Sequence, residues 1–130
     1  MDKSLHSILY VDDEEDIREV VALSLQLDSG LDVAIAASGA DALRYLETRI
    51  PDLVVLDVMM PGLDGPGTLL QMRERPETAA IPVIFLTAKV RRDEVDRFHA
   101  LGAIGVIAKP FDPMTLAQQL RVVWSDYYRL

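Results

Sequence analysis

The sequence predicts a single α/β domain in which helices cover both faces of a parallel sheet. Short apolar runs of strand length alternate five times with longer segments whose apolar residues recur at helical spacing. Such alternation is typical of β-α-β units, which pair their strands in parallel and place helices on the faces of the sheet. A chain of 130 residues has the length of one domain, here residues 1–130.

The first half of the chain supplies two predicted strand–helix pairs. Residues 8–11 form an apolar run, and Ser29-Gly30 is expected to end the helix that follows. In that helix Ile17, Val20, Val21 and Leu25 recur at helical spacing. Residues 33–36 form the second strand, and Ser38 is expected to cap the second helix. That helix has Leu43, Leu46 and Ile50 on its inner face, and Pro51 closes it.

The third strand begins the second half. Residues 53–56 are four aliphatic residues in a row, typical of a strand buried on both faces. Asp64 is expected to cap the third helix, with Pro66 in its first turn. The inner face of this helix is assigned to Leu69 and Met72. The fourth strand covers residues 83–86 after Pro82.

The last two helices flank the fifth strand, residues 106–108. Gly102 is expected to end the fourth helix, and Pro113 to begin the fifth. Their inner faces are assigned to Val95, Phe98 and Leu101, and to Leu116, Leu120, Val123 and Tyr127.

Composition excludes several functional classes. The net charge is −8, which argues against direct nucleic-acid binding, because that depends on a surface of Lys and Arg. No apolar segment approaches the roughly 18 residues of a membrane span, and the N-terminus has no signal-peptide pattern. The chain has no cysteine, which fits a cytoplasmic protein.

Four predicted strands end in polar residues. Asp12 and Asp13 follow the first strand, Asp57 the third, Thr87 the fourth and Lys109 the fifth. Open α/β sheets keep their chemistry at the carboxyl ends of their strands, so these residues are expected at one edge. The alternation does not itself fix the strand order, but the order 2-1-3-4-5 would make the three acids neighbours.

These residue types point to phosphoryl transfer. Three neighbouring carboxylates repel each other and stay ionised together only with a cation among them. Hard oxygen ligands of this kind suit Mg²⁺. A carboxylate can also act as a nucleophile and form an aspartyl phosphate. The transfer mainly requires that charge on the moving oxygens be neutralised. Mg²⁺, the ammonium of Lys109 and the hydroxyl of Thr87 would do so.

The sequence resembles the receiver domain of two-component response regulators over essentially its whole length. The motifs that it shares with this family are residues 11–13, 56–65, 86–88 and 109–111. The resemblance implies a flavodoxin-like five-stranded sheet in the order 2-1-3-4-5 with five helices. It also implies a cis bond between Lys109 and Pro110, which an X-Pro bond tolerates at low cost.

The resemblance also implies roles for the strand-end residues. Asp57 would accept a phosphoryl group from phosphohistidine on a sensor histidine kinase or a histidine phosphotransfer protein, and thereby switch partner binding. The Mg²⁺ ligands would be Asp13, Asp57 and the backbone carbonyl of Met59, with Asp12 acting mainly through water. Lys109 and Thr87 would contact the phosphoryl oxygens. The protein would be a signalling protein that catalyses only its own phosphorylation and slow autodephosphorylation.

Three positions bear on the switch and on its lifetime. Many receivers carry a mobile aromatic residue three positions before the Lys, and here Val106 has no ring to rotate. A different signal route is therefore expected, through the loop after Thr87 or the fourth helix. Met59 cannot orient an attacking water, and Lys89 could attract the phosphoryl charge or block water. Autodephosphorylation is therefore expected to be no faster than average.

Alternatives remain open at this stage. A degenerate receiver would act unphosphorylated as an interaction module. An Asp-nucleophile phosphatase would need a second acid where this chain has Met59, and a flavodoxin-like FMN carrier would need a phosphate loop where residues 12–15 are all acidic.

The face made by the fourth helix, fifth strand and fifth helix often carries dimers or partners in the family. The start at Met1 and the end just past the fifth helix favour a stand-alone protein, while the cognate kinase and output partner stay unnamed.

Overall fold

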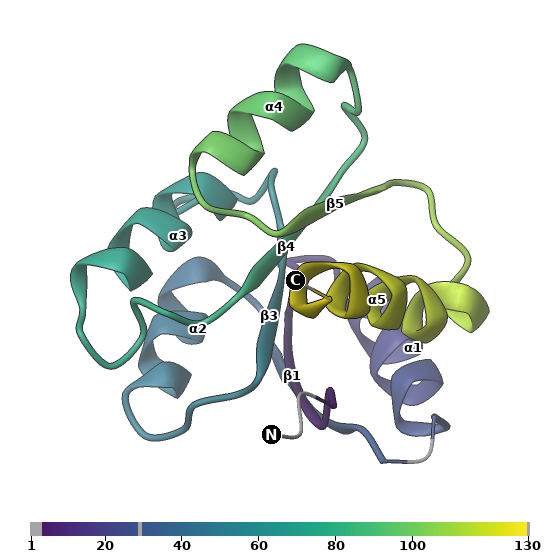
Figure 1. Cartoon of the computed structure of the whole chain (residues 1–130). Helices are drawn as coiled ribbons and strands as arrows, with labels where there is room; N and C mark the ends of the chain where they lie inside the picture. Colours follow the sequence, from purple (N-terminus) through teal and green to yellow (C-terminus); the bar gives the residue numbers. More distant parts are fainter. Residues whose placement is uncertain (1–3, 29, 130) are drawn as a thin grey trace.

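The computed structural model describes residues 4–28 and 30–129, which form a five-stranded parallel sheet between two layers of helices (Figure 1). The strands are β1 (Ser7–Val11), β2 (Asp32–Ala36), β3 (Leu53–Asp57), β4 (Val83–Thr87) and β5 (Gly105–Ala108). The helices are α1 (Glu15–Gln26), α2 (Gly39–Leu46), α3 (Gly65–Glu74), α4 (Arg92–Ala100) and α5 (Pro113–Tyr128). The sheet order is β2-β1-β3-β4-β5, which confirms the predicted fold. Across the described residues, no helix has the length and apolar character needed to cross a membrane.

The core consists of two hydrophobic clusters, one on each face of the sheet. The helices α1 and α5 cover one face, and α2, α3 and α4 cover the other (Figure 1). Side chains alternate along a strand. In β1, Leu9 and Val11 therefore pack with α2 and α3, whereas Ile8 and Tyr10 pack with α1 and α5. All five residues of β3 are buried, as expected for a central parallel strand.

Side-chain caps fix where several helices begin. Ser38 and Asp64 accept hydrogen bonds from the backbone amides of Asp41 and Gly67 at the starts of α2 and α3, which confirms both predicted caps. Asp112 caps α5 in the same way, and the predicted proline is the first residue of that helix.

Apolar spacing overstates the inner faces of three helices. Ile17 and Val20, two of the apolar residues at helical spacing in α1, are 36% and 50% exposed and so lie outside the core. The helix α2 ends before Ile50, which is exposed, and on α5 the buried position is Trp124 instead of Tyr127. Ile50 lies beyond the end of its helix, whereas Tyr127 lies beside the buried stripe of α5, which continues from Trp124 to Tyr128.

The first helix also ends earlier than predicted. It stops at Gln26, and Leu27 is its C-cap. Gly30 follows with a φ of 96°, a conformation that favours glycine. Ser29, the other half of the predicted stop, lies outside the described residues.

The strand register aligns the carboxyl ends of the central strands. Val11 at the end of β1 pairs with Leu56, and Asp57 pairs with Leu86. Thr87 at the end of β4 pairs with Ala108. The residues that end or follow these strands are therefore presented along one edge of the sheet.

Candidate functional site

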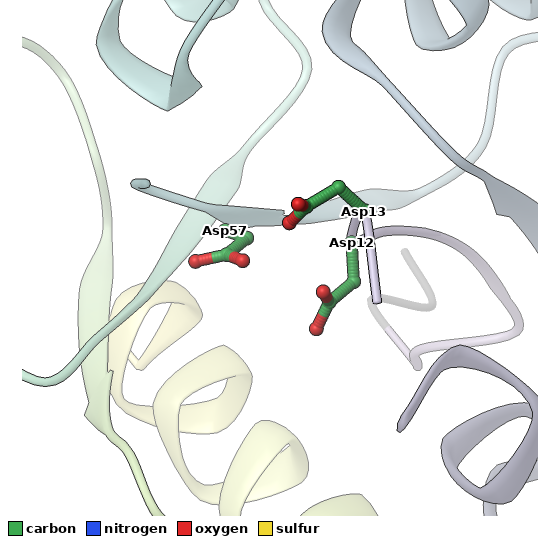
Figure 2. Close-up of side chains that lie close together, drawn as sticks. All are labelled: Asp12, Asp13 and Asp57. Atoms are coloured by element: carbon green, nitrogen blue, oxygen red, sulfur yellow. The ribbon is translucent and has the colours of Figure 1, made fainter. Parts of the chain in front are cut away.

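The three predicted acids and Lys109 come together at this carboxyl edge. Asp12 and Asp13 follow β1, Asp57 ends β3 and Lys109 follows β5. Each acid places a carboxylate oxygen within 4.8 Å of the other two. Figure 2 shows the three side chains gathered at the strand ends. Asp12 and Asp57 are buried, whereas Asp13 is exposed. The predicted juxtaposition of the three acids is confirmed.

Asp12 is held by hydrogen bonds to both of its carboxylate oxygens. The Tyr10 hydroxyl donates to Oδ2 over 2.9 Å, and the backbone N–H of Glu14 donates to Oδ1 over 3.0 Å. The guanidinium of Arg18 on α1 donates to the Asp12 backbone carbonyl over 2.9 Å. Neither Tyr10 nor Arg18 was predicted from the sequence to belong to the site. A signal existed for Tyr10, because residues two apart on a strand share a face.

Lys109 supplies the positive charge of the cluster. Its Nζ lies 3.0 Å from Asp57 Oδ2 and 3.6 Å from Asp12 Oδ2. The peptide bond between Lys109 and Pro110 is cis, as the resemblance implied. The side chain of Lys109 is only 21% exposed, so its ion pairs are partly shielded from solvent.

Burial and charge shift the proton affinities of this cluster in a consistent direction. Burial raises the pKa of Asp57, although the hydrogen bond and charge of Lys109 oppose that shift. Burial alone would lower the pKa of Lys109, but its hydrogen bond to Asp57 and the charges of both buried acids outweigh it and raise that pKa. Burial and the neighbouring Asp12 also raise the pKa of the Tyr10 phenol far above its usual value. Lys109 therefore stays charged and Tyr10 stays protonated near neutral pH.

Backbone amides near the strand ends complete the site. The N–H of Met59 donates to Asp57 Oδ1 over 3.3 Å, and the Met59 residue is 69% exposed. Thr87 is buried, and its Oγ1 accepts a hydrogen bond of 3.0 Å from the backbone N–H of Lys89. Because a hydroxyl both accepts and donates, the O–H of Thr87 is able to donate to a further oxygen.

The loop after β3 returns close to Asp57 because α3 begins with a glycine. The N–H of Gly65 donates to the carbonyl of Val58 over 3.0 Å. A Cβ atom at Gly65 would lie 2.6 Å from the carbonyl oxygen of Asp57 and 2.9 Å from the Val58 Cα. A side chain at this position would therefore push the start of α3 and the end of β3 apart.

A largely apolar cavity of about 420 Å³ opens beside Lys109, between α1 and the segment that follows β5. Ile17 and Val20 line it on the α1 side, and Pro110 and Phe111 line it opposite. This position explains why the two α1 residues are not buried in the core. They face the cavity at the site.

The donor set fits a hard divalent cation. Three carboxylates face one ammonium, so the cluster holds more negative than positive charge. Mg²⁺ prefers oxygen ligands and keeps several of its waters. Both oxygens of Asp12 accept hydrogen bonds, from Tyr10 and Glu14, and both oxygens of Asp57 accept them from Lys109 and Met59.

Comparison with known proteins identifies related chains. The family model for the response regulator receiver domain matches residues 8–121. The response regulator Rre1 of Synechocystis is 36% identical over 115 residues, which are 88% of this chain and 50% of the relative. The alkaline phosphatase synthesis transcriptional regulatory protein PhoP of Bacillus subtilis is 40% identical over 118 residues, which are 89% of this chain and 47% of the relative. The chain thus spans about half the length of these curated relatives.

Solved structures show the same architecture along nearly the whole chain. The chemotaxis protein CheY4 of Vibrio cholerae superposes with a TM-score of 0.83 at 32% identity, covering 92% of this chain and 99% of that chain. A response regulator described as putative from Chloroflexus aurantiacus superposes with a TM-score of 0.80, also at 32% identity, covering 94% of this chain and 99% of its own.

Proposed function

Because the chain belongs to the response regulator receiver domain family, we propose that Asp57 accepts a phosphoryl group from a phosphohistidine on a sensor histidine kinase or a histidine phosphotransfer protein. One observation carries the proposal. The buried Asp57 carboxylate has an oxygen within 4.8 Å of the Asp12 and Asp13 carboxylates and another contact of 3.0 Å to the Lys109 ammonium. The proposed setting is the cytoplasm, which fits a chain without cysteine.

In this proposal Asp57 is the nucleophile. A carboxylate oxygen forms a bond to phosphorus while the bond between phosphorus and the imidazole nitrogen breaks, and the imidazole leaves with the electron pair. Lys109 then exchanges its contact with the carboxylate for one with the phosphoryl oxygens. Thr87 donates its hydroxyl hydrogen to another of these oxygens. Both contacts reduce the negative charge that builds up during transfer.

The proposed cation is Mg²⁺, held by Asp13, Asp57 and the carbonyl of Met59, with Asp12 binding through water. When bound, it would neutralise charge on the phosphoryl oxygens and on the clustered acids. The exposed position of Asp13 allows its carboxylate to turn toward the ion. The Met59 amide already bonds to Asp57, which keeps the loop carbonyls near the same point.

The proposed output is a change in partner binding. Val106 packs against the core cluster on the α2–α4 face and has no ring to swing inward. We therefore place the signal route in residues 88–91 and in α4, whose fully buried residue is Phe98. The face formed by α4, β5 and α5 is the proposed surface for a partner or a second copy. The degenerate-receiver and phosphatase alternatives gain no support from the family match.

Intact mass after incubation with phosphoramidate or acetyl phosphate and Mg²⁺ tests the proposal. We expect one added phosphoryl group, which is lost in Asp57→Asn and when EDTA replaces Mg²⁺. Asp64→Asn is a matched control on the next loop and is expected to keep the adduct. Failure of the wild-type chain to form an adduct with any small donor or with a histidine kinase would overturn the proposal.

A further inference from the structure

We propose that Tyr10 is a positioning residue for the acidic cluster: its buried hydroxyl fixes Asp12, so that Lys109 remains paired with Asp57. This inference rests on the proposed Mg²⁺ site and adds to it a residue of β1 that lies behind the carboxylates. Tyr10 would touch neither the metal nor the phosphoryl group. It would act through the orientation of Asp12.

The position of Tyr10 leaves its hydroxyl little freedom. The residue is 0% exposed and belongs to the cluster between the sheet and the helices α1 and α5. It pairs with Val55 of β3, which is buried in the same cluster. The packed ring therefore aims its hydroxyl along the strand at Asp12, two residues further on. The O–H must be the donor, because an ionised carboxylate only accepts.

The hydrogen bond matters because Asp12 and Asp57 compete for one ammonium. Lys109 Nζ is 3.0 Å from Asp57 Oδ2 and 3.6 Å from Asp12 Oδ2, so it favours Asp57. The Asp12 oxygen nearer to Lys109 is the same Oδ2 that accepts from Tyr10. Because that oxygen already accepts a hydrogen bond, the Asp12 carboxylate attracts the Lys109 ammonium less strongly. Without the phenol, a fully buried carboxylate oxygen would lose its hydrogen bond and draw the ammonium toward itself.

The other Asp12 oxygen is fixed as well. The Glu14 amide donates to Oδ1 over 3.0 Å, and Arg18 anchors the Asp12 carbonyl over 2.9 Å. Loss of the Tyr10 bond alone would leave the carboxylate free to tilt toward Lys109 about the Oδ1 contact. Hydrogen-bonding partners that orient the carboxylates of metal sites typically contribute 10–100-fold to affinity. Because Asp12 would act through water, we expect about 10-fold, the lower end of that range.

The test is an NMR titration with Mg²⁺ alone, without a phosphoryl donor. Tyr10→Phe keeps the ring and removes one oxygen, and we expect its Mg²⁺ dissociation constant to rise about 10-fold. Tyr45→Phe removes a hydroxyl from a half-buried tyrosine on α2 and should leave the constant unchanged. In an Asp12→Asn background, Tyr10→Phe should have little further effect, because the acid through which it acts is gone. A full 10-fold loss in that background would assign Tyr10 a purely structural role and overturn the proposal.

A second measurement follows the hydroxyl proton of Tyr10 in the wild-type chain. A phenol buried against a carboxylate should give a slowly exchanging hydroxyl proton signal that is absent in Tyr10→Phe and that shifts when Mg²⁺ is added. If the protein binds Mg²⁺ but the chemical shift of this proton does not change, the positioning role would be overturned. Absence of any Mg²⁺ binding by the wild type would instead refute the proposed metal site on which this inference rests.

Discussion

Lys109 Nζ lies 3.0 Å from Asp57 Oδ2, joining the strands β5 and β3 across the intervening strand β4. This contact balances part of the negative charge of the site. The same ammonium forms ion pairs with two buried carboxylates, because Asp12 Oδ2 lies 3.6 Å from the same nitrogen. The stability of the fold and the reactivity of the site therefore depend on the same side chain.

Removal of this ammonium should destabilise the fold. Lys109→Met leaves Asp12 and Asp57 buried without their counter-charge, and we expect the free energy of unfolding to fall by about 2 kcal/mol without Mg²⁺. Urea unfolding measures the change. Lys89→Met, at an exposed position in the loop after β4, is the matched control and should unfold with wild-type stability. Added Mg²⁺ should restore part of the loss if the ion binds the folded state. Equal stability of the two lysine variants would contradict this account.

The pair formed by Arg121 and Asp28 should make stability depend on pH. Arg121 Nη2 and Nε lie 2.8 and 3.3 Å from the two Asp28 oxygens, linking α5 to the segment after α1. The hydrogen bond from Arg121 lowers the pKa of Asp28 below its ordinary value of 3.8. A lowered pKa contributes stability above the unfolded-state pKa, and this contribution is lost as the pH falls through the folded-state pKa.

Asp28→Asn should therefore lower the free energy of unfolding at pH 6, and its difference from the wild type should shrink as the pH falls below 3.8. The two side chains are about one-third exposed, so solvent screening limits the effect to at most about 1 kcal/mol. Urea unfolding at pH 6 and at a series of lower pH values measures it. Asp126→Asn removes the acid of a more exposed pair on the same helix and should show no such convergence. A constant difference between Asp28→Asn and wild type across this range would refute the assignment.

The close approach at Gly65 should be intolerant of a methyl group. A Cβ atom there would lie 2.6 Å from the Asp57 carbonyl oxygen, so Gly65→Ala must shift β3 or α3. We expect a loss of about 2 kcal/mol and slower phosphorylation from phosphoramidate. Gly62→Ala is the comparison, because Gly62 has a φ of 72° but nothing within 4 Å of its Cβ position. It should lose about 1 kcal/mol from backbone strain alone and keep the phosphorylation rate. Indistinguishable phosphorylation rates would contradict the steric argument.

The lifetime of the proposed aspartyl phosphate should respond to residue 59. Met59 is 69% exposed next to the acceptor and offers no group that could orient water. Met59→Asn adds an amide that can hold an attacking water, so we expect autodephosphorylation to become several-fold faster. Loss of the phosphoryl mass over time measures the rate. Met114→Asn changes a similarly exposed methionine on α5 and should leave the rate as in wild type. A wild-type half-life of a few seconds would itself contradict the expected slow hydrolysis.

The fold and most of the site were predictable because strong local signals agree with the final packing. The aliphatic run before Asp57 buries all of its side chains when it forms a strand covered on both faces. The acid that ends this strand then lies at the edge of the sheet. Caps such as Ser38 and Asp64 depend on a few neighbouring residues, so they can be predicted from the sequence. The strand order required the resemblance, because alternation alone is compatible with several orders.

The failures have two physical causes. Helical spacing tells which residues lie on one stripe, but not how much of that stripe a neighbour covers. Ile17 and Val20 continue the apolar face of α1 past the sheet edge, where they line a cavity instead of the core. Tyr10 was missed for the opposite reason. Within an apolar run it resembles a core residue, and only the structure shows its hydroxyl against Asp12.

The order of the strands along the chain also has a consequence for its synthesis. Translation produces Asp12 and Asp57 well before Lys109, which follows the last strand. A nascent chain that has emerged only as far as β4 would hold both acids but lack the ammonium that balances them. Part of the charge of the two buried acids is therefore balanced only when β5 joins the sheet, and this late step should favour completion of the domain over persistence of a partly folded fragment.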